Sequence, residues 1–180
     1  MARGRPIIVD VEASGFGGQS YPIEVGVAMD DETKFCSLIA PAPDWKHWDG
    51  EAEKLHGITR EVLDSHGRPI QEVAGRMNEL LDGKTVFTDG WVVDKAWLST
   101  LFERAGIEMR FRVSALESIL SERQMDIWHA TKDKVVAEAE RQNREDPLQE
   151  PIFRHRASFD AWVIQETYKR TLDETRTAPA

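Results

Sequence analysis

The chain has 180 residues, enough for one domain with a sizeable core, and we expect a single domain over 1–180, with a core at about 6–172 and a disordered tail at about 173–180. Its formal net charge of −9 argues against a broad basic surface that tracks duplex nucleic acid, although a small local site with divalent cations is compatible with this charge. The apolar runs are only a few residues long, which excludes a transmembrane helix and a signal-peptide core, so we expect a cytoplasmic protein with no membrane partner.

Three short strands are predicted at the start, joined as an antiparallel meander. The apolar run Pro6–Asp10 suits a buried strand, and a turn at Gly15–Ser20 separates it from a second strand at Ile23–Ala28. A polar turn precedes the third strand, Lys34–Ile39, which contains the single cysteine, Cys36. One cysteine excludes an intramolecular disulfide, and we interpret Cys36 as a small buried apolar residue.

Helices and strands alternate in the rest of the chain. Short helical turns are predicted at Gly50–Leu55 and Thr59–Asp64, and a strong amphipathic pattern ending in a glycine predicts a helix at Ile70–Leu81. The remaining predicted elements are a strand at Lys84–Thr88, a helix at Val93–Ala105, a strand at Met109–Val113, helices at Ser114–Ser121 and about Thr131–Arg144, and a last helix from about Ala157. This order indicates an α/β domain with a mixed sheet.

Two carboxylates, Asp10 and Glu12, stand together where the first strand ends. Alternate residues of a strand point to the same face, so these side chains lie side by side. Adjacent carboxylates repel one another unless a positive charge lies between them, and Mg²⁺ or Mn²⁺ prefers oxygen ligands. An Asp-x-Glu pair is common on solvated surfaces, but its position after a buried apolar strand and before a glycine turn favours a metal site.

Three later residues complete a possible catalytic set. Asp94 lies at the start of a helix, where an acid without a catalytic role would also be favourable. Asp89 is the alternative candidate for the same role, and we interpret it as a turn residue. His155 and Asp160 lie at the start of the last helix. An imidazole suits a general base for water, whereas a surface histidine and a helix-start acid are the plainer interpretation of this pair.

Taken in order, these segments resemble the 3′→5′ exonucleases with four acids and one histidine, often called the DEDDh or proofreading-exonuclease group. The matching motifs are Val9-Asp10-Val11-Glu12-Ala13-Ser14-Gly15 with Pro22–Val27, then Leu55-His56-Gly57-Ile58-Thr59, then Trp91–Leu98, then His155–Ala161. The resemblance runs from about residue 6 to about residue 170. A sister group carries a tyrosine four positions before the last acid, where this chain has Arg156, so the histidine version applies.

The resemblance implies an α/β, ribonuclease-H-like fold with a central mixed five-stranded sheet flanked by helices. It implies two Mg²⁺ (or Mn²⁺) ions held by Asp10, Glu12, Asp94 and Asp160, with His155 as the base for the attacking water. The implied reaction is a two-metal hydrolysis that removes nucleoside 5′-monophosphates from the 3′ ends of single-stranded DNA or RNA.

The resemblance also implies five contacts with the terminal nucleotide: the backbone at Ala13, Ser14 and Gly15, and the side chains of Leu55 and His56. Trp91, which departs from the family pattern, is a sixth candidate because its ring could stack on a base. The alternative to nucleotide contact is burial in the core for Leu55 and Trp91, and a structural role in a turn for His56. Asp89-Gly90-Trp91 stands where many relatives carry His-Asn-Ala, a departure that affects substrate preference.

Several alternatives stay open. The chain could be a non-catalytic module that binds nucleic acid or protein, a proofreading subunit of a polymerase, or an enzyme for very short RNA, although the presence of all five catalytic residues favours an enzyme. A homodimer is possible. Arg156 either reaches a phosphate or lies on a plain surface, and we interpret His47 as solvated.

Overall fold

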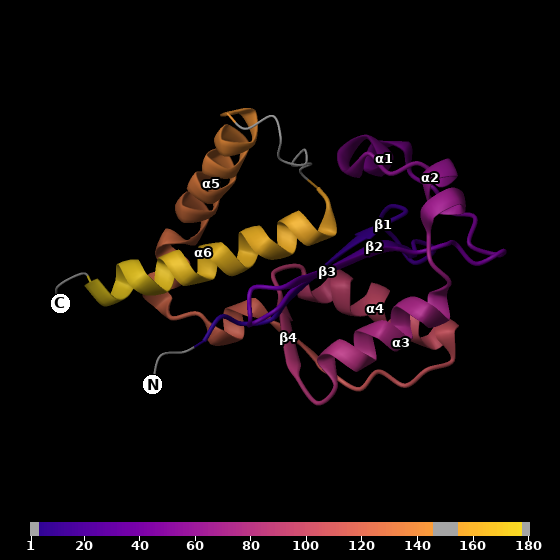
Figure 1. Cartoon of the computed structure of the whole chain (residues 1–180), viewed down its shortest axis with the longest axis horizontal. Helices are drawn as coiled ribbons and strands as arrows, with labels where there is room; N and C mark the ends of the chain where they lie inside the picture. The colour runs from indigo at the N-terminus through magenta and orange to yellow at the C-terminus, as the bar shows by residue number, and fades with distance from the viewer. Residues whose placement is uncertain (1–3, 146–154, 178–180) are drawn as a thin grey trace.

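A mixed five-stranded sheet organises the protein (Figure 1). The computed structural model describes residues 4–145 and 155–177. The strands are β1 (Ile8–Ala13), β2 (Pro22–Ala28), β3 (Lys34–Leu38), β4 (Thr85–Thr88) and β5 (Arg112–Ala115), and they lie in the order β3-β2-β1-β4-β5. β1, β2 and β3 pair as an antiparallel meander, and β4 and β5 continue the sheet parallel to β1. The predicted mixed sheet is therefore confirmed.

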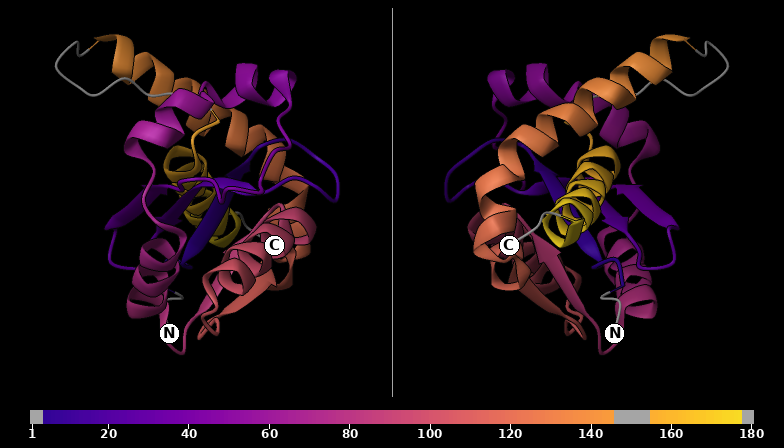
Figure 2. Two further views of the ribbon diagram at one scale, coloured as in Figure 1. Left: turned by 90° about the vertical axis from the view of Figure 1, so that its right-hand side faces the viewer. Right: turned by 90° about the vertical axis from the view of Figure 1, so that its left-hand side faces the viewer.

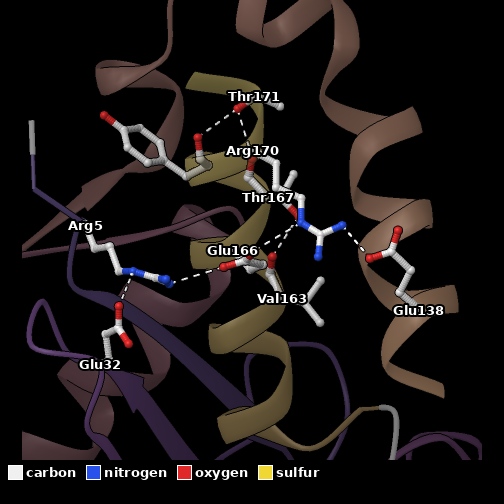
Figure 3. Close-up of polar contacts among 9 residues, drawn as sticks. Arg5, Glu32, Glu138, Val163, Glu166, Thr167, Arg170 and Thr171 are labelled. Carbon is white, nitrogen blue, oxygen red and sulfur yellow. Dashed lines mark hydrogen bonds and ion pairs between the residues drawn. The ribbon is translucent and has the colours of Figure 1, made fainter. Parts of the chain in front are cut away.

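Helices cover both faces of this sheet (Figures 1 and 2). On one face lie α3 (Ile70–Leu81) and α4 (Trp91–Ala105), and across the other runs α6 (Ala157–Thr177). The long helix α5 (Glu122–Glu145) packs on α6, and Arg170 of α6 donates to Glu138 of α5 at 2.7 Å (Figure 3). Two short helices, α1 (Gly50–His56) and α2 (Arg60–His66), stand at one end of the sheet, and a 3₁₀ turn, η1 (Leu116–Ile119), follows β5.

Alternation along β1 decides which side chains face each helical layer. Val9 and Val11 pack in the core beneath α3 and α4, whereas Ile8 packs with Ile164 of α6. Because successive strand residues point to opposite faces, Asp10 and Glu12 share the side of Ile8 and face α6.

Three local predictions near the sheet need correction. β1 continues to Ala13, so Asp10 and Glu12 lie within the strand rather than at its end. The helix expected at Ser114–Ser121 is only the 3₁₀ turn η1, because β5 extends to Ala115. Cys36 is exposed, since β3 is an edge strand with poorly covered faces, and the prediction of a buried cysteine was wrong.

The start of α5 lies at Glu122 rather than near Thr131. Ser121 and Gln124 form a capping box: the backbone nitrogen of Gln124 donates to Ser121 Oγ at 3.3 Å, and that of Ser121 donates to Gln124 Oε1 at 3.2 Å. Ser-x-x-Gln is a known signature of a helix start, which our interpretation of the sequence overlooked.

The C-terminal helix is also longer than predicted. α6 continues to Thr177, so most of the tail expected at 173–180 is helical, and 178–180 lie outside the described residues. Across 4–145 and 155–177, no helix is long and apolar enough to cross a membrane.

The capping box gives a prediction about stability. Ser121→Ala removes the oxygen that accepts from Gln124, and should lower the free energy of unfolding by about 1 kcal/mol in urea titrations. Ser121→Asp keeps a capping oxygen and should stay within a few tenths of a kcal/mol of the wild type. An equal loss in both variants would show that the cap does not stabilise α5.

Candidate active site

Three carboxylates from the two ends of the chain meet on the α6 face of the sheet. One oxygen from each of Asp10, Glu12 and Asp160 lies within 4.8 Å of the others. The close approach of α6 depends on Gly26, which pairs with Asp10 in the β1–β2 ladder. A β-carbon on Gly26 would lie only 2.2 Å from the carbonyl carbon of Ala157, so no other residue leaves room for the first turn of α6. The predicted grouping of these three acids is present.

Asp94 adjoins this cluster from the first turn of α4. Its side chain is buried, and the hydroxyl of Thr88, at the end of β4, donates to Asp94 Oδ2. The backbone nitrogen of Gly90 donates in turn to Thr88 Oγ1 at 2.9 Å. These contacts hold the Asp94 carboxylate in place. An exposed acid that only stabilises the start of a helix would not need such contacts.

Burial and mutual repulsion raise the pKa of these acids. Burial first, and then the charges of Asp160 and Glu24, raise the pKa of Glu12 to about 8. Burial also raises the pKa of Asp94 to about 7, and the pKa of Asp10 lies well above its ordinary value through burial and the charges of Asp94 and Asp160. Burial, together with the neighbouring negative charges, therefore favours the protonated form of these acids near neutral pH unless a cation binds among them.

His155 lies on the entry to α6, two residues before the helix begins. Its side chain is exposed, and its backbone φ of 58° falls in the left-handed region, which histidine adopts more readily than most residues. This left-handed residue turns the chain into the helix that carries Asp160.

The expected nucleotide-contacting backbone forms a tight turn after β1. Ser14 is buried, and its hydroxyl accepts from the backbone nitrogen of Tyr21 at 3.1 Å and bonds with His47 Nδ1 at 3.2 Å. Gly15 has a φ of 142°, and a β-carbon there would lie 2.6 Å from the Cβ of Asp49. The expectation of a solvated His47 was wrong, because this ring supports the turn.

The other three predicted contacts have different environments. Leu55 and Trp91 are exposed at 58% and 38%, so the alternative of burial in the core is wrong for both, although Trp91 Nε1 donates to the carbonyl of Val113 at 3.3 Å. His56 is buried, and its Nδ1 accepts from the backbone nitrogen of Ile58 at 3.0 Å. This bond supports a structural role for His56 in the turn after α1.

Three residues of this region were not singled out from the sequence. Phe16 is 70% exposed beside Gly15, and an aromatic residue in a glycine-rich turn was the available signal. Thr88 orients Asp94 without any distinctive sequence pattern. Glu24 is buried within the apolar run of β2, and an acid in such a run signals a positively charged partner, here Arg156.

Two further residues of this region form ion pairs. Arg156 donates to Glu24 from Nε and Nη2, so most of its guanidinium is engaged within the protein, and its contact with a phosphate stays a prediction. Asp89 forms an ion pair of 2.6 Å with Lys132 of α5, and its charge also acts on Asp10 and Asp94. Asp89 is thus more than a turn residue.

In sequence, the chain matches no protein-family model and no curated protein. In structure, it is similar to E. coli exonuclease I in complex with a dA16 oligonucleotide, with a TM-score of 0.61 and 16% identity over 95% of this chain and 41% of that one. The zinc-bound E. coli exonuclease I–ssDNA complex gives 0.60 and 15% over 95% and 40% of the two chains. Exonuclease I from Methylocaldum szegediense gives 0.64 and 15%, again over 95% and 40%. The chain thus spans less than half the length of these exonuclease I chains, and it shares their fold, as expected from the sequence.

Proposed function

We propose that this protein is a metal-dependent 3′→5′ exonuclease that releases nucleoside 5′-monophosphates from single-stranded DNA ends, with RNA ends as the alternative substrate. The observation that carries the proposal is the meeting of Asp10, Glu12 and Asp160 within 4.8 Å. The presence of bound single-stranded oligonucleotides in exonuclease I structures of the same fold supports the substrate class.

The residues of the cluster fit divalent cations. All the donors are carboxylate oxygens, which suit Mg²⁺ or Mn²⁺. Burial and the neighbouring acids raise the pKa values of Asp10 and Glu12, and a bound cation would offset both effects. We assign Asp10, Glu12 and Asp160 to one ion, and Asp10 with Asp94 to a second. Bound ions would neutralise the phosphate oxygens and lower the pKa of the attacking water.

The histidine and the acids divide the work between them. In this proposal, His155 accepts a proton from the attacking water, and its exposed position lets that proton pass to solvent. Thr88 keeps Asp94 oriented by donating to its Oδ2. The strand and two helices that carry these acids are rigid elements, so the reacting groups need little reorganisation.

Recognition of the strand would depend on its bases. The protein carries a net charge of −9, so attraction of phosphates contributes little to affinity. Two exposed aromatic side chains lie on segments next to the acids: Phe16 lies in the turn after β1, and Trp91 begins α4. Aromatic side chains stack on bases of any sequence, which favours single strands with unpaired bases.

The first prediction concerns the chemistry. With Mg²⁺ or Mn²⁺, the protein should shorten a 5′-labelled single-stranded DNA from its 3′ end, and EDTA should stop the reaction. Asp10→Ala should reduce the rate by more than about 100-fold, beyond what loss of a merely supporting residue costs. His155→Gln should cost roughly 10²–10⁴-fold, the usual contribution of a general base.

The matched control is Asp30→Asn. Asp30 is an exposed acid in the turn between β2 and β3, paired with Lys84 at 3.8 Å, and its loss should leave the rate unchanged. No cleavage of labelled DNA or RNA by folded, metal-supplied wild-type protein would exclude a free-standing nuclease and favour a binding module or a partner-dependent subunit.

The second prediction concerns pH and metal. Glu12 has a pKa of about 8 in the folded protein and 4.5 ordinarily, so between these values the folded state holds protons that the unfolded chain has lost. Without metal, the free energy of unfolding should therefore fall as pH rises from about 5 to about 8, by roughly 1.4 kcal/mol for each unit of pKa difference. Calorimetric melting in EDTA measures this dependence.

Two comparisons test its origin. Asp10→Asn removes a carboxyl group whose burial among other acids is unfavourable, so in EDTA near neutral pH it should raise the melting temperature by several degrees, at roughly 2–4 °C for each kcal/mol. Adding Mn²⁺ should stabilise the wild type more than this variant. If the melting temperature in EDTA instead rises with pH over the same range, the pKa of Glu12 is not raised in the folded protein.

The third prediction concerns the apolar surface. Phe16→Ala should raise KM for single-stranded DNA by roughly 5–150-fold, the 1–3 kcal/mol typical of one base–aromatic stack, with a smaller change in kcat. Phe16→Tyr keeps a ring and should bind nearly as the wild type does. An unchanged KM in Phe16→Ala would place the strand elsewhere.

A further inference from the structure

Glu24 is a buried acid that the proposed chemistry does not use. Its side chain in β2 has no exposed surface, where an unpaired carboxylate would be strongly unfavourable. Arg156 satisfies it: Nε donates to both carboxylate oxygens at 3.0 Å, and Nη2 donates to Oε1 at 2.5 Å. The backbone nitrogen of Ala157 adds a bond to Oε2 at 2.9 Å. Cys36 Sγ of β3 also donates to Oε1 at 3.4 Å, but most of the hydrogen bonds to this carboxylate come from the start of α6.

These contacts are made where α6 begins. The backbone nitrogens of Phe159 and Asp160 donate to the carbonyl of Arg156 at 2.9 and 3.0 Å, so Arg156 opens the helix. The first nitrogens of a helix lack partners within it, and Glu24 accepts from one of them, that of Ala157. A carboxylate is also favourable beside a helix N-terminus. Glu24 therefore joins β2 to the first turn of α6.

The same ladder positions carry the metal-site acids. Glu24 pairs with Glu12, and Gly26 pairs with Asp10, and opposed residues of an antiparallel ladder point to the same face. A β-carbon on Gly26 would lie 2.2 Å from the backbone nitrogen of Ser158, so the first turn of α6 lies directly on the sheet beside Asp10. A small shift of this turn would move Asp160 relative to β1.

We propose that Glu24 and Arg156 are positioning residues: their ion pair holds the first turn of α6 so that Asp160 completes the carboxylate cluster and His155 stands at its entry. Arg156 follows His155 directly and precedes Asp160 by one turn, so a single ion pair at Arg156 can fix the position of both residues. The effect of this ion pair on catalysis rests on the proposed function. Its effect on metal binding can be measured without any nuclease activity.

Three variants separate the possible roles. Arg156→Met keeps the length of the side chain but removes its charge and hydrogen bonds, and Arg156→Lys keeps the charge without the two-pronged geometry. The double variant Glu24→Gln/Arg156→Met leaves no unpaired buried charge, which preserves folding if Arg156→Met alone does not fold.

Arg5→Met is the matched control. Arg5 forms an ion pair of 3.2 Å with Glu166, which lies in the same helix more than one turn beyond Asp160 (Figure 3). Losing this pair removes a comparable link between α6 and the rest of the protein without touching the first turn of the helix. All variants and the wild type are measured for melting temperature, for Mn²⁺ affinity by titration calorimetry, and for kcat and KM on a single-stranded oligonucleotide.

Arg156→Met and the double variant should lose Mn²⁺ affinity by roughly 10–100-fold, the usual effect of removing a group that supports a metal ligand. Their kcat should fall by about 100-fold with KM nearly unchanged, because a displacement of about 1 Å has such a cost. Arg156→Lys should recover part of both losses. Arg5→Met should lower the melting temperature and leave Mn²⁺ affinity and kcat at wild-type values.

Two results would overturn the positioning role. In the first, Arg156→Met and the double variant have the same Mn²⁺ affinity and the same kcat as Arg5→Met. The other is a raised KM with unchanged kcat and Mn²⁺ affinity, which would place Arg156 on the strand instead. A wild type that binds Mn²⁺ but cleaves no nucleic acid would end the proposed function, and the Mn²⁺ comparison would still decide the positioning role. A wild type that binds no Mn²⁺ would overturn both.

Discussion

Repulsion among carboxylates is the constraint on which this structure depends. Asp10, Glu12 and Asp160 bring oxygens within 4.8 Å of one another, with the charge of Asp94 nearby. Such a group would separate if it lay on flexible loops. Here the acids are carried by β1, α4 and α6, whose cores on the two faces of the sheet hold them against the repulsion. Burial first, and then the charges of neighbouring acids, raise the pKa values of Asp10 and Glu12, so part of this repulsion persists in the folded protein.

The acidic character of the whole chain follows the same logic on a larger scale. Two cations near the cluster are engaged with carboxylates of the protein, as Lys132 is with Asp89 and Arg156 is with Glu24. Because the chain has a net charge of −9, its attraction for a phosphate backbone at a distance is weak, and recognition of a nucleic-acid strand would depend on its bases and on bound cations. This favours a strand end with unpaired bases over a long duplex.

Local patterns in the sequence predicted the fold where one physical signal dominates. The amphipathic run predicted α3 at Ile70–Leu81 with the bounds that the structure has, and the alternation of β1 placed Asp10 and Glu12 on one face. The prediction missed the first part of α5, because its charged sequence obscures the periodicity and the capping box at Ser121 went unnoticed. The exposure of Leu55 and Trp91 depends on which elements cover them in space, and periodicity along the chain does not carry that information.

Glu12 and Glu24 show why a site of this kind cannot be read from residue types alone. Both are glutamates within buried strands, they stand opposite one another in the β1–β2 ladder, and both face α6. Arg156 gives Glu24 a permanent positive partner, whereas Glu12 lies among Asp10 and Asp160 and has a raised pKa. The carboxylate of Glu24, which is paired with an arginine, stabilises the fold. The carboxylate of Glu12, which lies among other acids, can bind a cation. The difference is made by one arginine that lies 132 residues from Glu24 in sequence and in contact with it in the fold.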